Sequence, residues 1–155
     1  MNYSRTHADD TIKKLYESIG INRPPLIAPD IIAYRLGLEL AYLPVDSLRI
    51  NNRIYLDSRL STEIQQQQFG HELCHVLWHQ DNQLKLEQSF IDMQERQADN
   101  FALYACIPTD MLLSMPLPST ECEAVSVLTE TFNVTPEFAL KRLKLHLSKM
   151  YQTTY

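Results

Sequence analysis

The chain has 155 residues, of which 45% are hydrophobic and 21% charged, and its formal net charge is -5. A chain of this length buries enough surface to fold as one domain without disulfides, and this composition excludes disordered and fibrous proteins. The acidic balance argues against direct nucleic-acid binding, and no stretch approaches the roughly 20 apolar residues that span a bilayer.

The first residues and the cysteines indicate the compartment. Residues 1–10 are polar and acidic, where a secretory peptide has a basic region followed by an apolar run. Cys74, Cys106 and Cys122 are odd in number and form no C-x-x-C pair, which is typical of reduced, buried thiols. We therefore expect a cytoplasmic protein with no membrane partner.

Short helices and two strands are predicted in the N-terminal part. Apolar residues recur at helical spacing over Asp9–Ile19, and a second short helix is predicted over Asp30–Leu36, where Gly37 ends it. The segments Leu38–Leu43 and Arg53–Leu56 are short, aliphatic and aromatic, and polar turn-forming residues separate them. These two segments predict a small antiparallel sheet.

Helices dominate the remainder of the chain. Ser61 opens a long helix that continues to His79, and another helix is predicted over Glu87–Cys106. A helical pair follows at Thr120–Phe132 and Pro136–Met150, with Thr135 as the N-cap of its second member. We expect one α+β domain over residues 1–155, mainly helical, with a core at 1–118 and a helix-turn-helix-like hairpin at 119–150.

The long helix contains an H-E-x-x-H motif. Spacing of four residues places His71 and His75 on one helix face, one turn apart, so that one metal ion can bridge them. Glu72 is next to the first ligand and can reach a water on that metal, which makes it the natural general base. About one per cent of chains of this composition should contain the motif by chance. The alternative is a pair of surface histidines.

A catalytic zinc site uses three protein ligands and one open position, so a third donor must come from elsewhere. Glu95 on the following helix is the candidate, and Asp99 lies on the same face, where it can accept the outward N–H of a ligating imidazole. Small residues along this helix, Ala98, Ala102 and Ala105, should let it pack closely against the histidine helix. The alternative is that Glu95 and Asp99 belong to a solvated charged face.

The other histidines fit less well as ligands. His79 stands about 12 Å from His71 along one helix, too far for both to reach a metal with His75 between them. It is expected to act as a helix cap or a polar group lining the cleft. His7 and His146 have no companions at metal spacing and are expected on the surface.

Two runs of residues resemble the ImmA/IrrE family of metallo-endopeptidases. They are Phe69-Gly70-His71-Glu72-Leu73-Cys74-His75-Val76-Leu77-Trp78-His79 and Glu95-Arg96-Gln97-Ala98-Asp99-Asn100-Phe101-Ala102. The resemblance extends to Ile54-Tyr55-Leu56 and to Phe132-Asn133-Val134-Thr135 with Leu140 to Leu143, and it covers the chain from about Leu36 to Leu145. One departure is Cys74, where the family usually has glycine.

The resemblance implies a zincin-like fold in which His71, His75 and Glu95 hold one Zn²⁺ and Glu72 is the catalytic base. It also implies that the strand around Ile54 pairs with an extended substrate. Members of the family often cleave helix-turn-helix repressors of phages and mobile elements, so a repressor of this kind is the expected protein partner.

Two other functions are compatible with the sequence. A non-catalytic anti-repressor module could use the same surface to sequester a repressor without shortening it. The closing helical pair, with its basic cluster Lys141, Arg142, Lys144 and Lys149, could contact DNA. The acidic charge of the chain instead favours a hairpin that covers the core or docks the substrate.

Overall fold

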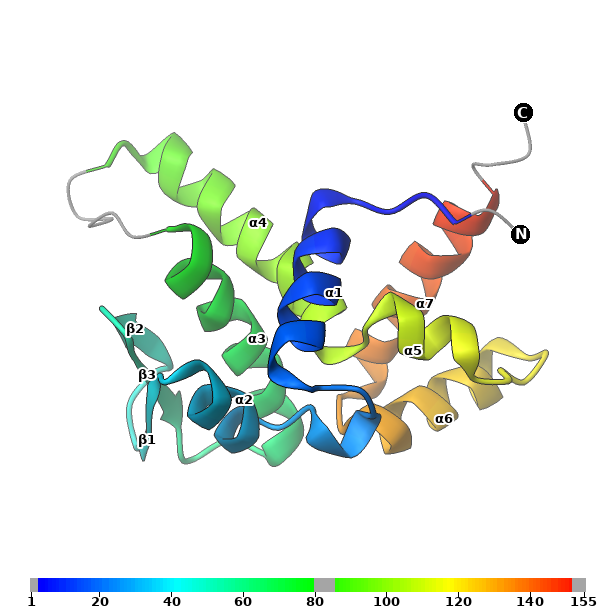
Figure 1. Ribbon diagram of the computed structural model, residues 1–155, viewed down its shortest axis with the longest axis horizontal. Helices are drawn as coiled ribbons and strands as arrows, with labels where there is room; N and C mark the ends of the chain where they lie inside the picture. Colours follow the sequence, from blue (N-terminus) through cyan, green and yellow to red (C-terminus); the bar gives the residue numbers. More distant parts are fainter. Residues whose placement is uncertain (1–2, 80–85, 152–155) are drawn as a thin grey trace.

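A computed structural model describes residues 3–79 and 86–151 of the chain (Figure 1). The helices among them are α1 (His7–Ile19), α2 (Pro29–Leu36), α3 (Thr62–Trp78), α4 (Gln88–Cys106), α5 (Thr109–Ser114), α6 (Glu121–Phe132) and α7 (Pro136–Tyr151), with a 3₁₀ turn η1 at Pro24–Leu26. The strands are β1 (Glu39–Leu43), β2 (Leu48–Ile50) and β3 (Arg53–Asp57). This mainly helical α+β architecture confirms the predicted fold class. None of the described helices is long and apolar enough to cross a membrane.

Local signals explain where the helices begin and end. The side chain of Thr6 accepts a hydrogen bond from the backbone N–H of Asp9, and Ser61 does the same for Ile64 at the start of α3. Gly20 and Gly37 adopt left-handed conformations with φ of 73° and 71°, which end α1 and α2. The predicted helices are therefore confirmed, with ends that shift by a few residues.

The contact between α3 and α4 is unusually close at Gly70. A Cβ atom added there would lie 3.2 Å from Ala102 Cα and 3.3 Å from Cys106 Sγ. Ala98 and Ala105 on the same helix are also buried. The small residues of α4 thus pack against α3 as predicted, and this packing positions the two helices that carry the H-E-x-x-H motif and Glu95.

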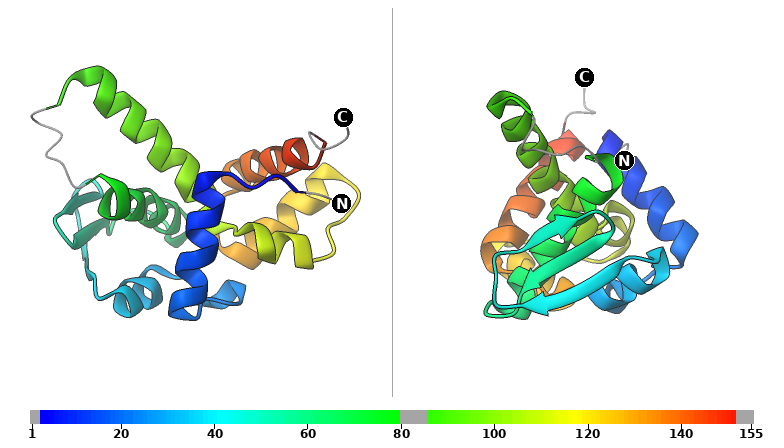
Figure 2. Two further views of the ribbon diagram at one scale, coloured as in Figure 1. Left: turned by 45° about the horizontal axis from the view of Figure 1, so that its top comes forward. Right: turned by 90° about the vertical axis from the view of Figure 1, so that its left-hand side faces the viewer.

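The sheet lies against α3, and its other face turns away from the helices (Figure 2, right). Its strand order is β1-β3-β2, with β1 parallel and β2 antiparallel to β3. The predicted antiparallel pairing of Leu38–Leu43 with Arg53–Leu56 is therefore wrong. The prediction missed the three-residue strand β2, which joins β3 through a hairpin turn with Asn51 at a φ of 53° and so reverses the direction of β3.

Both members of the C-terminal pair pack on the core, α7 against α4 and α6 against η1 (Figure 1). Arg142 has no exposed surface, and its Nε donates to the carbonyl oxygen of Ile107 at 2.9 Å. The basic cluster predicted on this helix is thus divided, because Arg142 faces the interior and cannot contact DNA. His146 is also buried, with 3% of its surface exposed, which corrects its expected place on the surface. The boundary at residue 118 stays a prediction.

The cysteines and His7 differ in burial. Cys74 and Cys106 are buried free thiols, as expected, whereas Cys122 is exposed, so the prediction that it is buried is wrong. The position of Cys74, which departs from the family pattern, is filled by a packed side chain with no exposed surface. His7 is exposed as expected, and its ring stacks on Trp78 with centroids 5.0 Å apart.

Candidate metal centre

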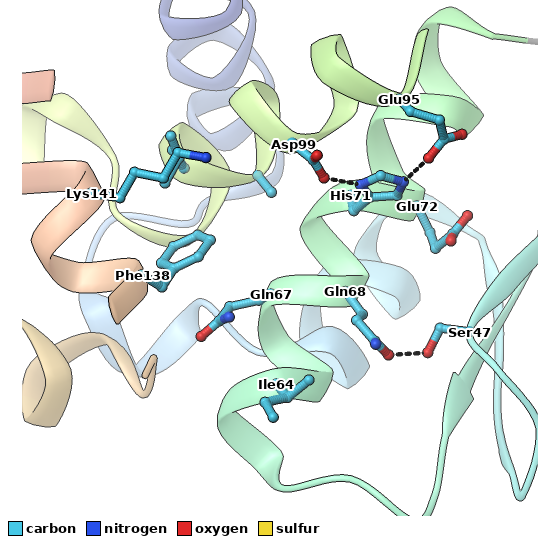
Figure 3. Close-up of a pocket in the computed structure, with 12 residues that line it drawn as sticks. Ser47, Ile64, Gln67, Gln68, His71, Glu72, Glu95, Asp99, Phe138 and Lys141 are labelled. Carbon is cyan, nitrogen blue, oxygen red and sulfur yellow. Dashed lines mark hydrogen bonds and ion pairs between the residues drawn. The ribbon is translucent and has the colours of Figure 1, made fainter. Parts of the chain in front are cut away.

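His71, His75 and Glu95 converge where α3 and α4 meet. The Nε2 atoms of His71 and His75 lie 3.2 Å apart, one turn from each other on α3. Oε2 of Glu95 lies 2.8 Å from His71 Nε2, and its Oε1 lies 3.1 Å from His75 Nε2. Each residue therefore offers one donor atom to a common point, and these atoms all lie within 4.8 Å of one another. Figure 3 shows His71 and Glu95 meeting above the cleft.

The spacing of these donor atoms fits a divalent cation. Four ligands held tetrahedrally at 2.0–2.2 Å from zinc are separated from each other by about 3.3–3.6 Å. The observed distances of 2.8, 3.1 and 3.2 Å are shorter than this by about 0.1–0.8 Å, a difference that side-chain rotations absorb. Two imidazoles and one carboxylate also match a donor set found in catalytic zinc sites, which leaves a fourth position open.

Burial keeps His75 in the neutral form that a metal ligand requires. It is 6% exposed, and burial lowers its pKa to about 4, while the nearby Glu95 carboxylate opposes this shift. A lowered pKa keeps the imidazole neutral at physiological pH, which is the form that binds a metal. His75 is thus ready to bind without first losing a proton.

Asp99 lies beside His71 on the side away from His75. Nδ1 of His71 donates to Oδ1 of Asp99 at 2.8 Å (Figure 3). A hydrogen on Nδ1 leaves the lone pair on Nε2, the atom that faces Glu95. The structure therefore places Asp99, one helical turn after Glu95, where it can orient the first histidine.

His79 contacts the outer side of His75. Its Nδ1 lies 2.9 Å from His75 Nδ1, and its Nε2 lies 2.7 Å from Oε1 of Gln97 on α4. Nη2 of Arg49 donates to the His79 carbonyl oxygen at 2.6 Å. His79 is buried and is the C-cap residue of α3, which confirms the first of its two expected roles, that of a helix cap. The sequence analysis missed Gln97, although it lies within the run that resembles the family, and Arg49 carried no signal.

Glu72 projects from α3 next to His71 and lines the cleft (Figure 3). Only 9% of its surface is exposed. Burial raises the pKa of its carboxyl group, His71 lowers it, and the negative charge of Glu95 raises it again. A carboxylate with a raised pKa takes up a proton more readily near neutral pH, as a general base must.

A cleft of about 510 Å³ extends from the metal centre to α7. Ser47, which precedes β2, and Gln68 of α3 lie on one side of it, joined by a hydrogen bond (Figure 3). Phe138 and Lys141 of α7 lie on the other side. The C-terminal helical pair thus forms part of the cleft wall, which the sequence analysis left as one alternative for this hairpin.

The sheet offers a different edge from the one expected. β3, which contains Ile54, pairs with β1 on one side and with β2 on the other. The expectation that this strand pairs with a substrate is therefore wrong, because its hydrogen-bonding groups are already used. β2 is an edge strand, and Ser47 places its start at the cleft.

Comparison with known proteins gives a consistent result. Residues 30–144 match the model of the M78 peptidase family, described as an IrrE N-terminal-like domain. The chain is 34% identical over 156 residues to the uncharacterized protein YqaB of Bacillus subtilis (strain 168), with 98% of this chain and 91% of that protein covered. It is 37% identical over 144 residues to the phage-like element PBSX protein XkdA of the same organism, with 90% of this chain and 73% of that protein covered.

Proposed function

The chain belongs to the M78 peptidase family, whose IrrE N-terminal-like domain it carries at residues 30–144, and from this premise we propose that it is a zinc-dependent endopeptidase. One observation carries the proposal: His71, His75 and Glu95 present donor atoms within 4.8 Å of one another beside a cleft. The donor set and its spacing favour zinc over magnesium or calcium, which prefer oxygen ligands.

The proposal assigns two roles, metal binding and proton transfer. His71, His75 and Glu95 hold the metal ion, which supplies Lewis-acid polarisation of the scissile carbonyl group. The Glu72 carboxylate takes the proton of the attacking water and later delivers it to the leaving amine. Burial of Glu72 and the neighbouring Glu95 charge support this role, because both raise the pKa of the group that must hold the proton.

The lining of the cleft supports a peptide substrate. A peptide could add to the open edge of β2 by main-chain hydrogen bonds, while neighbouring side chains select its sequence. Phe138 provides an apolar wall, and the exposed Lys141 provides a positive charge at the same side. An extended segment of a protein substrate would then pass between the sheet and α7.

The proposed substrate is a helix-turn-helix repressor of a phage or mobile element in the cytoplasm. It is supported by the likeness to XkdA, a protein of a phage-like element. A non-catalytic anti-repressor that uses the same surface is the competing function. The two differ in whether the repressor is shortened.

The test combines metal analysis with co-expression of the product of the neighbouring gene as the candidate repressor. We expect about one zinc per chain, a shortened repressor with the wild-type protein and an intact one with Glu72→Gln, which should keep its zinc. His75→Ala should lose both zinc and cleavage. Glu63→Gln, on the same helix but outside the cleft, serves as the matched control for Glu72→Gln.

Two outcomes would contradict the proposal. Cleavage by purified Glu72→Gln at the wild-type rate would exclude Glu72 as the general base. Relief of repression with an intact repressor would instead favour the anti-repressor function.

A further inference from the structure

On the side that faces away from Glu95, two further side chains, His79 and Gln97, are linked to His75 by hydrogen bonds. His75 contacts His79, and His79 contacts Gln97. We propose that Gln97 acts through His79 to determine which ring nitrogen of His75 carries its hydrogen, so that the Nε2 lone pair faces the metal position. Gln97 and His79 are then positioning residues, and the inference rests on the proposed function only in that the site holds a metal.

The contacts hold His79 in one orientation. The residue is 5% exposed, and its ring lies with its centroid 5.0 Å from that of His75 and is tilted by 54° from it. Its backbone N–H donates to the His75 carbonyl oxygen at 2.9 Å, and its own carbonyl oxygen accepts from Arg49 at 2.6 Å. The ring can therefore exchange hydrogen bonds only with His75 on one side and Gln97 on the other among the hydrogen bonds that the structure describes.

The direction of these hydrogen bonds follows from the Gln97 amide. Its Oε1 can only accept, so Nε2 of His79 must donate to it across 2.7 Å. A neutral imidazole carries one N–H, so Nδ1 of His79 must accept, and Nδ1 of His75 must donate across 2.9 Å. Nε2 of His75 then has no hydrogen, so its lone pair is free to bind a metal ion together with His71 Nε2 and Glu95, which lie 3.2 Å and 3.1 Å away.

A hydrogen-bond donor in place of the Gln97 oxygen would reverse the direction of both hydrogen bonds, the one between Gln97 and His79 and the one between His79 and His75. His79 Nε2 would accept, His79 Nδ1 would donate to His75 Nδ1, and the remaining hydrogen of His75 would move to Nε2. This hydrogen would point at the position where the metal binds and would oppose binding. The position of the His75 hydrogen therefore depends on one exposed side chain of α4, which acts against Glu95, because the Glu95 carboxylate lies 3.1 Å from His75 Nε2 and can accept that hydrogen when no metal is bound.

The same helix orients both histidines by different groups. Asp99 accepts from His71 directly, with a carboxylate that can only accept when ionised. Gln97 acts on His75 through one intervening ring. Because Gln97 lies on the surface of α4, it can be replaced without opening a cavity in the core.

The experiment compares Gln97→Lys, a donor-only side chain, with Gln97→Glu, an acceptor-only side chain. Asn100→Lys and Asn100→Glu, at an exposed position of the same helix, control for the added charge. Two quantities are measured: the zinc dissociation constant by chelator competition, and the position of the His75 hydrogen in metal-free protein by long-range ¹H–¹⁵N NMR.

We expect Gln97→Lys to move the His75 hydrogen from Nδ1 to Nε2 and to weaken zinc binding by about 10- to 100-fold, the usual effect of losing a partner that orients a ligand. Gln97→Glu should match Asn100→Glu in both measurements. A Gln97→Lys protein whose His75 signals and zinc affinity match those of Asn100→Lys would overturn the inference. If the wild-type protein binds no zinc, the proposed function fails, whereas the NMR measurement on metal-free protein still decides the role of Gln97.

Discussion

Replacing Gly70 with valine tests whether the close approach of α3 and α4 brings the proposed metal ligands together. Even the Cβ of alanine at this position would lie 3.2 Å from Ala102 Cα, 3.3 Å from Ala102 Cβ and 3.3 Å from Cys106 Sγ. Carbon atoms in contact are ordinarily about 3.5–4.0 Å apart. The two helices must therefore separate by several tenths of an ångström, and valine adds two further methyl groups at the same contact.

The expected loss of stability follows from two opposing effects. Overpacking costs about 1–3 kcal/mol, and the removal of a helix-interior glycine returns somewhat less than 1 kcal/mol when a β-branched residue replaces it. We expect Gly70→Val to lower the free energy of unfolding of the metal-free protein by about 2 kcal/mol. Gly70→Ala should lower it less, because alanine adds one atom and has the higher helix propensity. Urea denaturation measures both values.

The metal centre should weaken along with the fold. His71 follows Gly70 directly on α3, whereas Glu95 lies on α4, so separation of the helices draws the carboxylate away from both imidazoles. We expect zinc affinity to fall on the order of tenfold in Gly70→Val, as when a ligand loses its correct orientation. Chelator competition measures this value under conditions where the variant remains folded.

A double-mutant cycle identifies the contact responsible. Ala102→Gly removes the Cβ atom that the new side chain would meet at 3.3 Å. The double variant Gly70→Ala with Ala102→Gly should therefore be more stable than the sum of the single effects, by about 1 kcal/mol. Additive effects, or a Gly70→Val protein with wild-type zinc affinity, would refute the idea that this contact places Glu95.

Three further predictions concern the C-terminal helix and the metal. Arg142→Leu should lower the free energy of urea unfolding by about 1–3 kcal/mol, because the Ile107 carbonyl oxygen and the Thr109 hydroxyl lose their buried hydrogen bonds from Arg142, while Asp9 keeps its ion pair with Arg5. The exposed Lys141→Leu should change it by less than about 0.5 kcal/mol. Burial lowers the pKa of His146 to about 4, so below its unfolded pKa of 6.5 only the unfolded chain takes up the proton. Between pH 7 and pH 5, the free energy of unfolding should therefore fall by about 2 kcal/mol more in the wild-type protein than in His146→Phe. Urea unfolding at each pH measures this difference, and equal pH dependence in the two proteins would contradict the prediction. Zinc at 100 times its dissociation constant should raise the free energy of unfolding by about 2.7 kcal/mol in the wild-type protein and leave His75→Ala unchanged, which thermal denaturation with and without chelator can detect.

Much of the helical structure and the candidate metal ligands could be predicted from the sequence alone. Ser61 as an N-cap and the glycines at 20 and 37 are local signals, because each acts on backbone groups a few residues away. The spacing of His71 and His75 is equally local, since four residues along a helix always share a face. Glu95 could be predicted as the third ligand because its helix carries a row of small residues, which indicates close packing against the histidine helix.

Other features were decided only by the tertiary structure. The direction of β3, the burial of Arg142 and His146, the contact of His79 with Gln97 and the α7 wall of the cleft all join segments distant in the sequence or on different elements. Helix periodicity and capping depend on neighbouring residues, so the sequence shows them directly. Which polar side chain is buried, and which partner it meets, depends instead on how the completed elements pack against one another.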